Sequence, residues 1–329
     1  MNDFSYKKAD SVDTAVKASQ NRTSKIIAGG TNLVDLMKYR VENPSEIIDI
    51  TKLALETISQ TDDGGIRLGA LATNADTAYH AQVAHNYPML AQAILSGASA
   101  QLRNKATDGG NLMQRTRCYY FYDTTTPCNK REPGSGCSAI NGFNRIHAIL
   151  GTSEQCIATH PSDMCVALAA LDAKVNITGP SGDRSMSILD FHRLPGDKPE
   201  KDNNLNLGDV VTSIDLPAKG FKSHSAYLKI RDRESYAFAL VSVAAAIEIE
   251  NESIKEIRVA LGGVAHKPWR KVEVEQKYIG KSATEENFLA LAEDLLAGAK
   301  GFGDNDFKIV LAKRAIVRAL LTAKSKTVK

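Results

Sequence analysis

The sequence predicts an α+β protein with more than one domain. At 329 residues the chain is longer than a single hydrophobic core usually supports. Its first 55 residues alternate strand-type and helix-type segments, whereas the part from about residue 223 begins with long β-type runs and ends in two helical stretches. This change of pattern predicts a domain boundary near Lys219, with one domain over 1–219 and a second over 220–329.

The composition is that of an ordinary globular protein and excludes some classes of function. Lys and Arg number 41 against 38 Asp and Glu, a net charge of +3 that offers no basic stripe for nucleic acid. No apolar run reaches the roughly 18 residues of a membrane span, and the N-terminus lacks the pattern of a secretory signal. We therefore expect no nucleic-acid partner, no membrane span and no export signal in the chain itself.

The N-terminal 55 residues predict a small α/β unit. Ser11 is placed to cap a helix that runs to Gln20. A buried strand over 25–28 then leads through a double-glycine turn into a helix that begins near Thr31, and the segment EIIDI predicts a second strand. The order is therefore strand, glycine turn, helix, strand.

A second unit follows the polar turn TDDGG. It begins with the strand IRLGAL and continues with helices predicted around 74–85 and 88–95. Beyond the cysteines, PSDMCVALAALDA predicts a helix with Pro161 in its first turn, and KVNIT predicts a strand. The turn-rich stretch LPGDKPEKDNNLNLGD predicts a surface loop that leads into VVTSIDLP.

Three β-type runs dominate the last unit, namely AYLKI, AFALVSVAAAIEIE and IKEIRVALGGV. Two helices follow them. The first has Ser282 and Glu285 at the spacing of a capping box, and the second extends over about 304–324.

Two glycine turns are candidate phosphate-binding loops, AGGTNL at 28–33 and ATDGGNL at 106–112. Backbone N–H groups in such turns converge on one place and favour an anion. Two loops together would hold the pyrophosphate of a dinucleotide, and Thr107 and Asn111 would add side-chain hydrogen bonds. The alternative is that glycine is present only because the turn needs a positive φ.

A nicotinamide-dependent dehydrogenase of the Rossmann type is disfavoured. Neither glycine turn has the G-x-G-x-x-G pattern of that fold. One formal match, GSGCSA at 134–139, follows Pro133 and has no strand before it, so we interpret it as a chance match.

All five cysteines lie between residues 118 and 165. Four of them, Cys118, Cys128, Cys137 and Cys156, have the wide spacing C-x9-C-x8-C-x18-C, which differs from the paired C-x2-C of structural zinc and suits a loop wrapped around a 4Fe-4S cluster. Unrelated reduced thiols, or zinc bound together with His147 or His160, are the alternatives. Cys165 lies in the apolar segment MCVALAAL and is expected to be a core residue.

Several motifs together resemble the FAD-binding subunits of the molybdenum hydroxylases, the xanthine dehydrogenase family. They are AGGTNL, QLRNKATDGGNL, RCYYFYD, CIATHPSDM, KIRDRESYAFALVSVAAAI and LGGVAHKPWR, and they span nearly the whole chain. Within the family, the chain looks most like the aldehyde oxidoreductase branch.

This resemblance implies a PCMH-type FAD-binding domain over 1–219, made of α/β subdomains at about 1–55 and 56–219, and a C-terminal α+β domain of the CO dehydrogenase flavoprotein type over 220–329. A 4Fe-4S loop would be inserted at about 115–157. The residues that would contact FAD are Ala28, Gly29, Gly30, Thr31, Asn32, Leu33, Val34, Thr107, Gly110, Asn111, Asp163 and Lys229. For two of these a purely structural role is the alternative: Asp163 at a helix start, and Lys229 on a half-exposed strand.

The same resemblance implies that Cys118, Cys128, Cys137 and Cys156 ligate a 4Fe-4S cluster. The chain would pass electrons to an external acceptor from a large molybdenum-cofactor subunit and a small 2Fe-2S subunit, in a heterotrimer or its dimer. It would reach the periplasm bound to a partner that carries a twin-arginine signal, with the cytoplasm as the alternative. The other functions considered are a stand-alone flavin dehydrogenase and a non-catalytic metal-binding scaffold.

Overall fold

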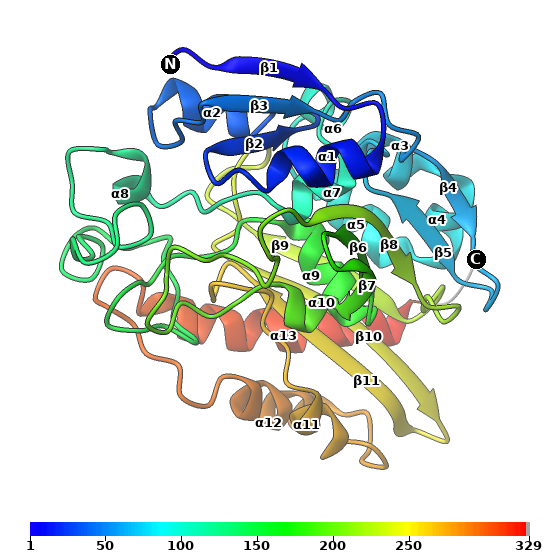
Figure 1. The fold of residues 1–329 in the computed structure, drawn as a ribbon. Helices are drawn as coiled ribbons and strands as arrows, with labels where there is room; N and C mark the ends of the chain where they lie inside the picture. The colour runs from blue at the N-terminus through cyan, green and yellow to red at the C-terminus, as the bar shows by residue number, and fades with distance from the viewer. Residues whose placement is uncertain (327–329) are drawn as a thin grey trace.

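The computed structural model describes residues 1–326, which fold around three β-sheets (Figure 1). A small parallel sheet lies at the N-terminal end, and a five-stranded antiparallel sheet follows it. A third, antiparallel sheet packs on a long C-terminal helix. The predicted α+β fold class is confirmed.

The N-terminal sheet has the order β1-β3-β2, with both strand pairs parallel. Ser11 caps the first helix as predicted, since its side chain accepts a hydrogen bond from the N–H of Thr14. The second helix begins two residues later than predicted because Gly30, with φ of +75°, extends the glycine turn. The elements are β1 (Ser5–Lys8), α1 (Val12–Ser19), β2 (Ser24–Ile27), α2 (Leu33–Lys38) and β3 (Glu46–Asp49).

The central sheet has the order β4-β5-β8-β6-β7 and is antiparallel throughout. Its strands are β4 (Ile58–Gln60), β5 (Ile66–Gly69), β6 (Lys174–Gly179), β7 (Gly182–Ser187) and β8 (Val210–Leu216). The helices of this unit are α3 (Asn74–Tyr79), α4 (Ala81–Asn86), α5 (Pro88–Ser96), α6 (Ala100–Arg103), α7 (Asp108–Leu112), α9 (Asp163–Ala170) and α10 (Ile188–Phe191). All of α9 is buried, and this helix packs on α5 and on strands of the third sheet.

Two local predictions in this unit are wrong. The helix predicted over 74–85 is two helices, because His80 has an extended backbone with ψ of 125°. Pro161 lies outside the first turn of α9, since Ser162 is the N-cap and its side chain accepts from the N–H of Cys165.

The cysteine segment between α7 and α9 is irregular backbone with one short helix, α8 (Tyr119–Tyr122). It projects from the side of the molecule (Figure 1). Its apolar side chains form a small core of their own with Leu36 of α2, and this core includes Phe121 and Ile157. The segment is therefore anchored on the N-terminal unit.

The C-terminal sheet is antiparallel with the order β11-β10-β9, and α13 covers it. The elements are β9 (Ser225–Ile230), β10 (Val241–Glu250), β11 (Ser253–Gly262), α11 (Val272–Gln276), α12 (Glu285–Leu295) and α13 (Phe307–Ser325). The sequence did not predict α11. The predicted capping box is wrong, because Thr284, rather than Ser282, caps α12 by accepting from the N–H of Asn287.

Among residues 1–326, the helices are too short or too polar to cross a lipid bilayer.

Candidate functional site

The first glycine turn, between β2 and α2, presses against the chain just before the second. A Cβ atom on Gly29 would lie 2.0 Å from the carbonyl oxygen of Lys105, so only glycine permits this contact. The structure therefore brings together the two glycine turns that the sequence singled out.

The two turns differ in their free hydrogen-bond donors. Among the described residues, the backbone N–H groups of 29–32 have no acceptor. The second turn is already satisfied: Gly109 donates to the carbonyl of Ala70, and Gly110 donates to the hydroxyl of Thr107. The expectation that both turns offer free backbone donors is therefore met only by the first turn.

A cavity of about 500 Å³ opens in front of these turns. Ala28 to Leu33 line it, together with Thr107 and Gly110, as the sequence predicted. The opposite wall includes Arg115 and much of the loop between 200 and 211. Its volume is within the usual range of small-molecule sites.

Four of the proposed contact residues do not line this cavity: Val34, Asn111, Asp163 and Lys229. Val34 lies within α2. The amide of Asn111 is used inside the protein, where it donates to Asn74 at 2.8 Å and accepts from the hydroxyl of Ser162 at 2.6 Å. Asn111 therefore holds the second turn against α9.

Asp163 and Lys229 form a buried ion pair outside the glycine cavity. The Lys229 Nζ lies 2.8 Å from one carboxylate oxygen of Asp163, and the hydroxyl of Tyr227 donates to the other at 2.6 Å. Asp163 lines a separate small cavity that also includes His160 and Phe238. The pair links the start of α9 to β9, and its side chains are 8% and 4% exposed.

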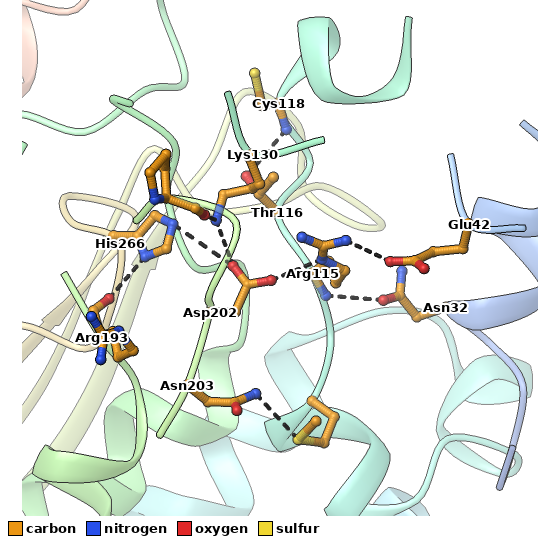
Figure 2. A network of polar contacts seen from close by, with 12 residues as sticks. Asn32, Glu42, Arg115, Thr116, Cys118, Lys130, Arg193, Asp202, Asn203 and His266 are labelled. Carbon is orange, nitrogen blue, oxygen red and sulfur yellow. Dashed lines mark hydrogen bonds and ion pairs between the residues drawn. The ribbon is translucent and has the colours of Figure 1, made fainter. Parts of the chain in front are cut away.

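Asp202 is the centre of a polar network that the sequence did not predict (Figure 2). Its carboxylate accepts from the Nζ of Lys130 at 2.6 Å and from the Nε of Arg115 at 2.8 Å, and it lies 3.7 Å from the Nε2 of His266. Arg115 also pairs with Glu42. Burial disfavours the charged carboxylate, but Lys130 and Arg115 outweigh it and hold the pKa of Asp202 well below its ordinary value.

The position of Asp202 links the two candidate sites. It lines the glycine cavity, and its partner Lys130 is two residues from Cys128. The loop that carries Asp202, residues 194–209, is rich in turn residues, which predicted a solvent-exposed surface. Nothing in its sequence pattern identifies Asp202 as buried.

Cys118, Cys128, Cys137 and Cys156 line one small cavity in the projecting segment. Cys128 and Cys137 face each other across an isolated antiparallel bridge, and the N–H of Ala158 donates to the sulfur of Cys156 at 3.4 Å. Burial raises the pKa of the Cys118 thiol to about 12 and that of Cys156 to about 11. The four widely spaced cysteines thus converge on one small cavity.

Cys165 lies elsewhere, in the core around α9, as predicted. His160, one of the two histidines considered as zinc ligands, lies near Cys165 and His192, away from the four thiols. The other, His147, reaches Cys118, with 3.0 Å between its Nε2 and the sulfur.

Asp108 is a buried carboxyl group within the second turn. It accepts from the amide of Asn74 and the hydroxyl of Thr77, and no cationic side chain is among its hydrogen-bond partners in the described part of the chain. Burial raises its pKa to about 7.

Comparison with known proteins identifies the class to which this fold and cavity belong. Residues 2–219 match the family described as the FAD binding domain in molybdopterin dehydrogenase, and residues 226–323 match the CO dehydrogenase flavoprotein C-terminal domain. The chain therefore belongs to the FAD-binding subunits of the molybdenum hydroxylases, a family of oxidoreductases. The resemblance inferred from sequence is confirmed.

Individual relatives agree with this assignment. The chain is 48% identical to the aldehyde oxidoreductase FAD-binding subunit PaoB of Escherichia coli K12, over 99% of both chains. It is 30% identical to the glyceraldehyde dehydrogenase medium chain of Sulfolobus acidocaldarius, over 86% of this chain and 84% of the relative. Carbon monoxide dehydrogenase from Hydrogenophaga pseudoflava has the same fold, with a TM-score of 0.77 at 24% identity and 98% coverage of both chains.

The glycine cavity fits the diphosphate of FAD. In the described part of the chain, the backbone N–H groups of residues 29–32 have no acceptor and the buried amide nitrogen of Asn32 has no partner, and all four residues line the cavity. Donors without acceptors are what a diphosphate requires.

Proposed function

We propose that the chain is the FAD and 4Fe-4S electron-transfer subunit of a molybdenum-containing aldehyde oxidoreductase. The observation that carries the proposal is the placement of four convergent cysteines beside a flavin cavity, in a chain 48% identical to an aldehyde oxidoreductase subunit. The aldehyde substrate is inferred from that relative and from the glyceraldehyde dehydrogenase chain.

In this proposal, the turn from Ala28 to Val34 binds the FAD diphosphate through the unpaired backbone N–H groups of residues 29–32. Thr107, Gly110 and Asn111 shape the second turn, Asp163 approaches the ribityl or adenosine part, and Lys229 lies near the flavin. FAD supplies the exchange between two-electron and one-electron transfer. The chain's own residues bind and orient it, because the described residues contain no nucleophile paired with a base at the cavity.

The four cysteines are the proposed ligands of the 4Fe-4S cluster. Four thiolates are the usual ligand set for such a cluster, and the irregular backbone between the cysteines lets sulfurs far apart in sequence meet. Cys118, Cys128 and Cys156 are buried, which would shield the cluster from solvent.

The proposed assembly adds a large molybdenum-cofactor subunit, which oxidises the substrate, and a small 2Fe-2S subunit, which passes electrons to this chain. An external acceptor then takes them from FAD. We also propose that the chain is exported to the periplasm bound to a partner that carries a twin-arginine signal, as the resemblance to the aldehyde oxidoreductase branch implies.

Substitution of one cysteine tests the metal site. Cys128→Ser removes one proposed ligand. It is expected to remove most of the roughly four iron atoms per chain and to abolish the low-field EPR signal of the reduced protein. Cys165→Ser is the matched control, since Cys165 is equally buried but lies in the α9 core, and it should keep both iron and FAD.

Unchanged iron and EPR signal in Cys128→Ser would show that the ligand set is wrong. If the wild-type protein is colourless and contains zinc, the four cysteines form a zinc site instead of a cluster site.

A further inference from the structure

His147 is held against one of the four cysteines. Its Nε2 lies 3.0 Å from the sulfur of Cys118, and only 1% of the residue is exposed. The rings of Tyr119 and Tyr120 pack near it, each with its centroid 6.4 Å from that of the imidazole. His147 is not among the residues that line the small cavity of the four cysteines, so it contacts Cys118 from outside that cavity.

The position of His147 is fixed from the C-terminal domain. Its carbonyl accepts from the amide of Asn305 at 3.2 Å and from the Nζ of Lys308 at 2.8 Å. Asn305 and Lys308 are both fully buried at the start of α13. Its own N–H donates to the carbonyl of Asn144 at 2.9 Å. The backbone that carries the imidazole is therefore braced by buried groups from a different domain.

The direction of this hydrogen bond is fixed if Cys118 is a metal ligand. A ligating thiolate carries no proton, so the hydrogen between the two atoms must belong to Nε2 of His147. Nδ1 is buried and has no hydrogen-bond partner in the part of the chain that the structure describes. The N–H bond toward sulfur is then the one strong polar interaction of the ring.

We propose that His147 donates a hydrogen bond to the Cys118 thiolate and thereby raises the reduction potential of the cluster. This inference rests on the proposed 4Fe-4S site. Reduction adds one electron to the cluster, which makes its sulfur ligands more negative and strengthens an N–H donor bond to them. The donor therefore stabilises the reduced form more than the oxidised form, and no proton has to move.

Redox titration of the purified full-length protein, followed by EPR, tests the proposal. His147→Leu removes the donor and is expected to lower the midpoint potential, with the ratio of reduced to oxidised cluster at the wild-type midpoint falling about tenfold, or about 59 mV for one electron. His147→Gln keeps an N–H donor and should shift the potential less. His85→Gln, on the exposed surface of α4, should leave it unchanged.

The possible outcomes distinguish a failure of this inference from a failure of the proposed cluster. Wild-type protein without iron would overturn both. Full iron in His147→Leu with an unchanged potential would overturn the role of His147 and leave the cluster standing. Loss of iron in both His147 variants would assign the residue to holding the metal, and would also overturn the proposal.

Discussion

The glycine cavity and the cysteine segment are built in opposite ways. The cavity lies between regular elements, and its binding groups are backbone N–H donors that exist before any ligand arrives. The cysteine segment is irregular apart from the four residues of α8, and its proposed binding groups are thiols, of which those of Cys118, Cys128 and Cys156 are buried. The first site offers donors that are ready for an anion, whereas the proposed cluster requires the thiols of the second to lose their protons when the metal binds.

This difference predicts how each site fails. The cavity should be destroyed by adding atoms to the first turn, because a Cβ on Gly29 would collide with the carbonyl oxygen of Lys105. The cysteine segment should be destroyed by removing atoms, because each thiol is a proposed ligand. Asp202 joins the two regions through Arg115 and Lys130 (Figure 2), so its loss should weaken the contact between them.

The largest expected effect is that of Gly30→Asp. Gly30 has φ of +75°, and its Cβ would lie 3.3 Å from Val34, so a side chain there is strained and places a negative charge against the diphosphate. We expect loss of bound FAD with iron retained, measured as flavin and iron per chain.

Gly64→Asp is the matched control for this substitution. Gly64 has a similar φ of +83°, but it lies in an exposed turn where the nearest atom is 3.7 Å away. The control should keep FAD. Full flavin content in Gly30→Asp would contradict the proposed diphosphate site.

Asp202→Asn should have the next largest effect. It leaves Lys130, whose side chain is 1% exposed, without its carboxylate, and the removal of one partner from a buried ion pair costs about 3 kcal/mol or more. We expect this loss in the free energy of unfolding at pH 7, measured with urea. Asp215→Asn, which breaks the surface pair with Arg67, should cost less than about 1 kcal/mol.

The pH dependence gives a further check on Asp202. Its pKa is lowered in the folded protein, so its stabilisation is present above the ordinary value of 3.8 and is lost as the pH falls. The wild type should therefore lose stability below about pH 4 more steeply than Asp202→Asn. Equal acid profiles would exclude this carboxylate as the charged centre of the network.

The smallest effect is expected at Asp108, a buried residue of the second glycine turn. Its pKa is raised from 3.8 to about 7, so its contribution to stability is greatest below about pH 4 and declines as the pH rises through 7. Asp108→Asn removes that decline. Relative to the wild type, the variant should gain roughly 2 kcal/mol between pH 5 and pH 7, at about 1.4 kcal/mol per unit.

Thermal unfolding at the two pH values measures this difference. A gap between Asp108→Asn and the wild type that stays constant with pH would indicate that the carboxyl group is already ionised at acidic pH.

The sequence predicted the parts of both sites that depend on local conformation or on rare residue types. Gly29 and Gly30 were identifiable because a second glycine turn occurs at 106–112, whereas one such turn alone is explained by the need for a positive φ, and the five cysteines were conspicuous because they all lie in one segment. Asp202 could not be found, since its burial depends on Lys130 and Arg115, which are 72 and 87 residues away. The cap at Thr284 was missed because several polar residues precede that helix and only packing selects one.

The ratio of iron to FAD in the purified wild-type protein tests the central claim most directly. The account predicts about four iron atoms and one FAD per chain, with flavin absorption on the broad shoulder of an iron–sulfur cluster. FAD without iron would contradict it, because the four cysteines would then line a cavity that holds no cluster.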